Sequence, residues 1–92
     1  MAKIIKTSGV TIEVSPRNGT DFQLDELQEF VGGYIEIVYL DNGQMMVVNE
    51  EGKLEGLPYN PLATMIVASK CKYLSGDIIV GDVLVCDGNQ VK

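Results

Sequence analysis

The stretch that decides the fold is residues 34–49, YIEIVYLDNGQMMVVN. Residues 34–40 are rich in β-branched and aromatic side chains, which is typical of a strand. Asp41-Asn42-Gly43 follows, and asparagine and glycine tolerate the positive φ that tight hairpin turns require. Residues 44–49 supply the return strand. The stretch therefore predicts an antiparallel hairpin in the middle of the chain.

A second hairpin is predicted before it. Residues 3–7 contain β-branched pairs, and Ser8-Gly9 provides a turn. Residues 10–14 then alternate apolar and polar side chains with a period of two, which indicates a half-buried strand. Turn-forming residues in 15–19 predict a loop.

A helix is predicted between the two hairpins, over residues 22–31. Its apolar residues recur at helical spacing and its acidic residues occupy the first turns. Residues 20–23 fit a capping box, although the helix could begin two or three residues later. Gly32 and Gly33 are expected to end it, one of them in the left-handed conformation.

The rest of the chain predicts a turn at 50–53, a short extended segment at 54–57 and a helix at 61–70. Proline at the first helical position after an asparagine cap favours the helix. Met65-Ile66-Val67 is β-prone, so a strand is the alternative there. Residues 78–86 predict a last strand with a bulge at Gly81.

The expected order is β-β-α-β-β-α-β in a single domain, residues 1–92. Hairpins imply antiparallel pairing, so the fold class is α+β. We expect a two-layer, mainly antiparallel sheet with two helices on one face. The other face would expose apolar residues of 34–40. A second copy of the chain could cover them, which predicts a homo-oligomer.

Composition argues against several functions. The net charge is −6, and the seven basic residues are scattered, so we expect no direct nucleic-acid binding. The chain has no histidine, no phosphate-binding glycine motif and no cysteine spacing typical of zinc sites. We therefore expect no catalytic residues, no metal and no cofactor, and predict that the protein is not an enzyme.

The cellular setting is inferred from other features. No apolar run approaches the ~20 residues of a membrane span, and the first residues do not resemble a signal peptide. Cys71 and Cys86 both lie among apolar residues, so we expect them to be free and buried. These features predict a cytoplasmic protein that binds no membrane.

The chain resembles a known family along nearly its whole length. The family pattern, LQxxVGGYIE followed by a hairpin and NEEGKLxGLPxN, is matched by residues 27–36 and 49–60. The ending GDIIVGDVLVC is also similar to the last strand of the family. Its members are short proteins of bacteria, phages and integrative elements, and their function is unknown. The resemblance implies a mobile-element context, where small acidic proteins often act in counter-defence or regulation, and it implies no activity.

Six polar, aromatic or proline residues in and around residues 49–60 form a candidate ligand site: Tyr34, Asn49, Lys53, Pro58, Tyr59 and Asn60. Each has a structural explanation, such as a turn cap at Asn49 or a helix cap at Asn60. Together, however, aromatic rings could stack on a base, amides could read its edge, and Lys53 with the start of helix 61–70 could hold a phosphate.

Two function hypotheses follow from the sequence. In the first, the protein is a non-catalytic oligomer that sequesters a small nucleotide signal. In the second, it is an interaction module that binds and inhibits or regulates a host protein through a sheet edge or an acidic face. A pocket at a subunit interface would favour the first hypothesis, and a bare strand edge would favour the second.

Overall fold

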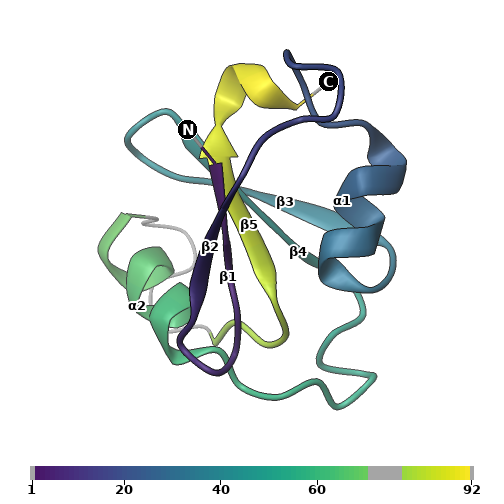
Figure 1. Cartoon of the computed structure of the whole chain (residues 1–92). Helices are drawn as coiled ribbons and strands as arrows, with labels where there is room; N and C mark the ends of the chain where they lie inside the picture. The colour runs from purple at the N-terminus through teal and green to yellow at the C-terminus, as the bar shows by residue number, and fades with distance from the viewer. Residues whose placement is uncertain (1, 71–77, 92) are drawn as a thin grey trace.

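The sheet of this protein is built from two hairpins and one inserted strand. The computed structural model describes residues 2–70 and 78–91. The elements follow the predicted order: β1 (Ala2–Ile5), β2 (Thr11–Val14), α1 (Leu24–Val31), β3 (Ile35–Tyr39), β4 (Gln44–Asn49), α2 (Pro61–Lys70) and β5 (Val83–Asp87), followed by the short 3-10 helix η1 (Gly88–Gln90). The strand order is β2-β1-β5-β4-β3, and the pairings are antiparallel (Figure 1). The α+β class and the antiparallel sheet are therefore confirmed.

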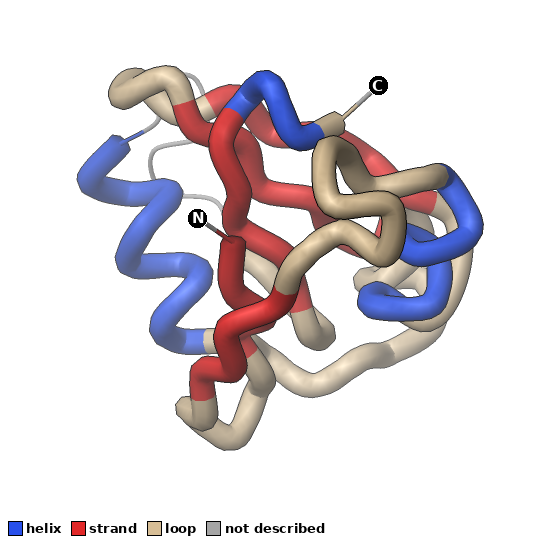
Figure 2. Tube along the Cα trace, turned by 45° about the horizontal axis from the view of Figure 1, so that its top comes forward, coloured by secondary structure: helices blue, strands red, loops and turns tan. Residues whose placement is uncertain are grey.

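The helices cover opposite faces of the sheet, so the prediction that both lie on one face is wrong. Ala63 and Val67 of α2 pack on a cluster that includes Met46 and Val85. Leu27 and Val31 of α1 pack on a cluster that includes the alternate residues Val47 and Leu84. Figure 2 shows the strands in red between the two helices in blue. The molecule therefore has three layers.

The two central strands explain this arrangement. β4 is buried from Met45 to Asn49, and β5 is buried from Val83 to Cys86. Successive side chains of a strand point to opposite faces, so an uninterrupted apolar run needs cover on both sides. The expected bare sheet face is consequently occupied, because α1 packs against β3, β4 and β5. The apolar face that motivated the predicted homo-oligomer is thus largely covered within one chain.

The boundaries of α1 refine the prediction. The helix begins at Leu24, two residues later than 22, and Gln23 is its N-cap. The Gln23 N–H donates to a Glu26 carboxylate oxygen at 2.8 Å, so the capping box lies at 23–26 and not at 20–23. Gly32 has φ 80° and ends the helix in the left-handed conformation. That part of the prediction is confirmed.

Three other elements can be compared with their predictions. Residues 61–70 form a helix and not the alternative strand. Residues 54–56 lie in turns, so the extended segment expected at 54–57 is wrong there. The last strand begins only at Val83, because Gly81 has φ 78° and turns the chain. Before that turn Val80 forms an isolated bridge with Tyr59.

The predictions of free, buried cysteines and of no membrane span can be compared with the described residues. Cys86 is free and buried, as predicted, whereas Cys71 lies outside the described residues. Neither α1 nor α2 combines the length and apolar character of a membrane span, and the described ranges hold no other helix that does.

Candidate functional site

Asn60 is a structural residue at the junction of three elements. Its side chain is fully buried. Its Oδ1 accepts the Ala63 N–H at 3.0 Å, which caps α2, and its Nδ2 donates to the carbonyls of Ile5 at 3.0 Å and Gly81 at 2.9 Å. Both amide hydrogens are therefore engaged within the protein. The predicted helix cap is confirmed, and no donor of Asn60 is left for a ligand.

Asn49 is occupied in a similar way at the end of β4. It is buried, and its Oδ1 accepts the Glu51 N–H at 2.8 Å. Its Nδ2 donates to the Val31 carbonyl and to Glu55 Oε1, each at 3.2 Å. Asn49 thus joins the end of α1 to the turn after β4, and the expected turn cap is present.

The other four candidate residues lie near the surface. Tyr34 and Tyr59 are 66% and 51% exposed, and Lys53 and Pro58 are also exposed. The Pro58 carbonyl accepts the Gly81 N–H at 2.7 Å. Lys53 and Asn49 border one pocket, and Pro58 borders another. Neither tyrosine lines the pocket that Lys53 and Asn49 border or the pocket that Pro58 borders.

The pocket that Lys53 borders lies between the β3–β4 hairpin, the following turns and the segment 78–80. It has a volume of about 170 Å³. Most of its walls are aliphatic, with Glu36, Asn49, Glu50 and Lys53 as the polar members: it is lined by Glu36, Val38, Val48, Asn49, Glu50, Lys53, Leu54, Ile78, Ile79 and Val80. This volume is well below the roughly 300–1,000 Å³ of pockets that hold drug-sized ligands.

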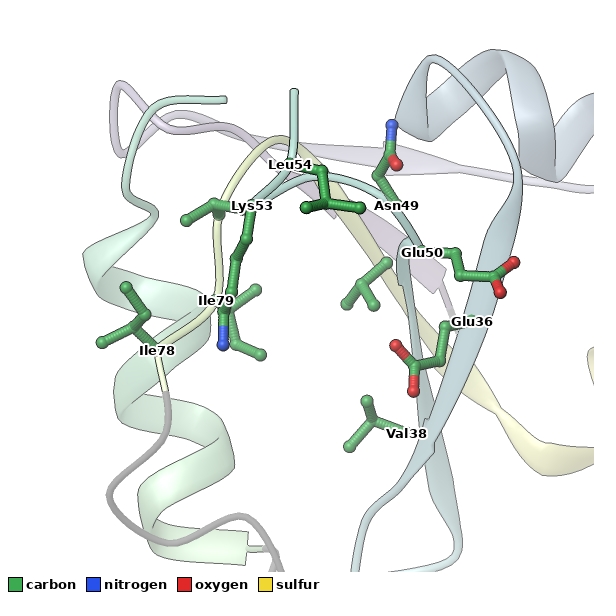
Figure 3. Close-up of a pocket in the computed structure, with 10 residues that line it drawn as sticks. Glu36, Val38, Asn49, Glu50, Lys53, Leu54, Ile78 and Ile79 are labelled. Atoms are coloured by element: carbon green, nitrogen blue, oxygen red, sulfur yellow. The ribbon is translucent and has the colours of Figure 1, made fainter. Parts of the chain in front are cut away.

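The charged groups of the pocket are arranged on two sides. In Figure 3 the Glu36 carboxylate turns toward the pocket from β3, and Lys53 extends along the opposite wall beside Ile79. Glu50 stands beside Glu36 with its carboxylate directed outward, and the Asn49 amide points away from the pocket. Two acidic residues and one basic residue therefore border the pocket, which favours a cationic group in a ligand over an anionic one.

The pocket opens beside an unpaired sheet edge. β3 is the last strand of the sheet, and no described strand pairs with its outer side. The Tyr34 carbonyl accepts the Glu50 N–H and the Leu40 N–H donates to the Gln44 carbonyl, each at 2.9 Å. Antiparallel ladders alternate, so even-numbered residues bond to β4 and the backbone groups of Ile35, Ile37 and Tyr39 point outward. These N–H and C=O groups can form hydrogen bonds with an additional strand.

Some pocket residues could have been anticipated from the sequence. The period-two pattern of residues 34–40 already places Glu36 and Val38 on one face of the strand. Glu50 was expected only as part of the turn at 50–53. The wall formed by Ile78, Ile79 and Val80 depends on the Tyr59–Val80 bridge and on Thr64, whose hydroxyl accepts the Ile79 N–H at 2.9 Å. These are tertiary contacts, which local sequence patterns do not predict.

Ionisable groups elsewhere have structural roles. Burial raises the pKa of the Cys86 thiol to about 11, so it stays protonated at neutral pH and is a poor nucleophile. Glu26 accepts the N–H groups of Gln23 and Arg17, and these bonds lower the pKa of its carboxyl. Within residues 2–70 and 78–91, no group of three or more His, Cys, Asp and Glu side chains is placed to hold a metal ion.

Comparisons with known proteins give a family but no activity. No curated protein and no solved structure matches the chain. A family model described as DUF3846, a domain of unknown function, matches residues 4–91. The match spans both hairpins, both helices and the last strand, so it covers the whole sheet apart from its first two residues. The chain therefore belongs to the DUF3846 family.

Proposed function

We propose that this protein is a non-catalytic binding module that captures an extended, basic segment of another protein along the outer edge of β3. The observation that carries the proposal is the position of the pocket beside that edge. A strand added to β3 would present alternate side chains to the pocket side of the sheet, next to Glu36 and Val38. One lysine or arginine side chain of the partner would enter the pocket.

The physical properties of the pocket support a side chain over a nucleotide. Its volume of about 170 Å³ suits a group far smaller than a nucleotide. The methylene groups of a long basic side chain would pack against the apolar residues Val38, Val48 and Leu54. Its charged end would lie near Glu36 and Glu50. The overall charge of −6 would also draw a basic partner toward the protein.

The setting of the proposal comes from the resemblance to proteins of phages and integrative elements. In that setting the partner is a host protein in the cytoplasm, and binding inhibits or regulates it, as in counter-defence. Such a role needs only shape and charge, which agrees with the lack of histidine. The alternative is an oligomer that sequesters a nucleotide signal. It would need basic groups to bind phosphate, whereas the lining of this pocket has two acidic residues and one lysine.

A peptide display experiment tests the proposal and does not require the partner to be identified first. Random extended peptides are selected on the immobilised protein and the winners are sequenced. We expect β-branched residues with lysine or arginine at alternate positions, and we expect binding to weaken as salt rises. Amide resonances of Ile35, Ile37 and Tyr39 should shift when the selected peptide is added.

Matched variants decide whether the edge and the pocket act together. Ile37→Pro removes an outward N–H and should abolish peptide binding, whereas Ile37→Val keeps that donor and should bind normally. Glu36→Gln should lower affinity for lysine-containing peptides, and Glu13→Gln on β2 should not. Unchanged binding by Ile37→Pro would refute the edge. A nucleotide retained in native mass spectra, and lost in Lys53→Ala and Tyr59→Ala, would favour the sequestering function instead.

A further inference from the structure

The opposite edge of the sheet carries a second unpaired strand with different chemistry. β2 is the first strand in the sheet order, and no described strand pairs with its outer side. The residues Thr11, Ile12 and Glu13 are all exposed. Val10 and Ile12 are large apolar residues that are 52% and 41% exposed. This edge lies at the far end of the sheet from β3, so it is independent of the proposed partner site.

The hydrogen-bond pattern shows which backbone groups of β2 are open. The Lys6 N–H donates to the Val10 carbonyl at 2.9 Å, and Ile12 lies opposite Ile4 in the same ladder. Even-numbered residues of this strand therefore bond to β1. The N–H and C=O groups of Thr11 and Glu13 point away from the sheet. An added antiparallel strand would bond to these two residues.

The apolar side chains of β2 share one face of the sheet. Val14 and Ile4 both pack against the cluster beneath α1. Ile12 lies opposite Ile4, so it belongs to the same face, and Val10 follows by the period of two. Val10, Ile12 and Val14 thus form an apolar stripe along the outer margin of the sheet, and its exposed part is uncovered in a single chain.

We infer that two copies of this chain pair through β2, antiparallel about a twofold axis at Ile12, to form one continuous ten-stranded sheet from two five-stranded ones. In this register Ile12 faces Ile12 of the second copy, and Val10 faces Val14. On the other face Thr11 stands opposite Glu13. All three apolar residues of the stripe find apolar partners, and no like charges face each other.

The open backbone groups agree with this register. Thr11 of one copy and Glu13 of the other become a hydrogen-bonded pair that exchanges two bonds, and the twofold axis repeats the exchange. A register centred on Glu13 would place two carboxylates face to face. A register centred on Thr11 would place Val14 opposite Ser8 and leave the stripe poorly matched. The register centred on Ile12 is the one that the residues of β2 favour.

Charge distinguishes the β3 edge from the β2 edge. A twofold pairing at β3 centred on Glu36 would place the Glu36 carboxylates of the two copies face to face. Like charges at neighbouring positions destabilise a strand pair. The edge with the acidic pocket is therefore left for a basic partner, and the edge with the apolar stripe serves the second copy.

Disulfide trapping tests the register directly. In a Cys71→Ser background, Ile12→Cys places two thiols at a non-hydrogen-bonded pair, where Cα atoms stand about 4.5 Å apart and a disulfide can form. Glu13→Cys is the matched control, because the two copies of residue 13 lie diagonally at roughly 7–8 Å or more. We expect mild oxidation to give a covalent dimer with Ile12→Cys and little with Glu13→Cys. Equal trapping at both positions, or none at Ile12→Cys, would overturn the inference.

Sedimentation of the protein without added cysteines provides the second arm. The parent should sediment as a dimer at micromolar concentrations. Thr11→Pro removes an outward donor that β1 does not use, so the protomer should keep its fold while dimerisation weakens about tenfold or more. Thr11→Val keeps the donor and should remain dimeric. A parent that sediments as a monomer would overturn the inference, and should Thr11→Pro unfold, the trapping pair still decides the register.

Discussion

Gly33 lies directly against the side-chain amide of Asn49. A Cβ on Gly33 would stand 3.0 Å from Asn49 Nδ2. The same amide donates to the Val31 carbonyl and to Glu55. Gly32, one residue earlier, is the glycine with positive φ. The two glycines therefore have different roles: Gly32 supplies a backbone conformation, and Gly33 makes room for a buried hydrogen-bonding side chain.

We predict that Gly33→Ala lowers the free energy of unfolding by about 1–3 kcal/mol, because the Asn49 amide must move away from its partners. Gly33→Val should be worse. In an Asn49→Ala background the Gly33→Ala change should cost much less, since the contact is gone. Urea denaturation of the four proteins of this cycle measures the coupling. Additive effects would show that the contact does not constrain Gly33.

Asn60→Ala should destabilise the protein by about 3–5 kcal/mol. The change removes the N-cap of α2 and leaves the buried carbonyls of Ile5 and Gly81 without their donor. Asn60→Ser keeps an acceptor for the cap, so it should lose less. Chemical denaturation gives both values. A loss below about 1 kcal/mol for Asn60→Ala would mean that solvent replaces these bonds.

Glu26 predicts a specific loss of stability in acid. Its folded-state pKa lies below the ordinary value of 4.5, chiefly because the Gln23 and Arg17 backbone N–H groups bond to the carboxylate. The unfolded chain therefore binds the proton first, and the contribution of Glu26 is fully present above pH 4.5. It is lost as pH falls through the lower folded-state pKa.

The measurement is a series of denaturation curves from neutral pH into acid. Glu26→Gln should be less stable than the parent at neutral pH, and this difference should shrink as the pH falls. Glu51→Gln, a change at an exposed residue in the turn after β4, is the control and should follow the parent. A constant difference between Glu26→Gln and the parent at every pH would contradict the linkage.

Cys86 should be inert in the folded protein. Burial raises the pKa of its thiol to about 11, so almost no thiolate is present at neutral pH. In a Cys71→Ser background, a thiol reagent should therefore label nothing in native buffer and one group per chain in denaturant. Rapid labelling of the native protein would show that the strand opens readily around this residue.

Local patterns predicted most of the elements. The hairpin at 34–49 and the helix at 61–70 follow from turn chemistry and from the Asn60-Pro61 start, and both are present. These features depend on neighbours in sequence, which propensity and capping describe well. The extended segment at 54–57 was wrong, because residues 51–56 instead close turns through backbone bonds such as Glu55 N–H to Glu51 at 2.9 Å.

The predicted placement of both helices on one face was wrong, although the sequence held a pattern that argued against it. The runs Met45–Val48 and Val83–Cys86 lack polar alternation, and such runs are typical of strands buried on both faces. The expected two-layer fold overlooked that pattern. The pocket is a different case. Its wall at 78–80 is set by contacts with Tyr59 and Thr64, which are distant in sequence.

The candidate site residues show the same difference between local and tertiary features. Caps at Asn49 and Asn60 were foreseen because capping is a local property. Their convergence with Tyr34 and Tyr59 on a ligand depends on tertiary geometry, which local patterns do not predict. Glu36 borders the pocket and escaped notice, because an alternating polar residue on a strand is ordinarily a solvent-facing one.

The central position of β5 has a consequence for how the protein is made. β5 pairs with β1 on one side and β4 on the other, so within the described sheet it joins the two hairpins. A ribosome delivers residues 83–87 after both hairpins have emerged. Until then β1 and β4 each lack the hydrogen bonds that β5 provides on one side. Folding should therefore complete in one late, cooperative step.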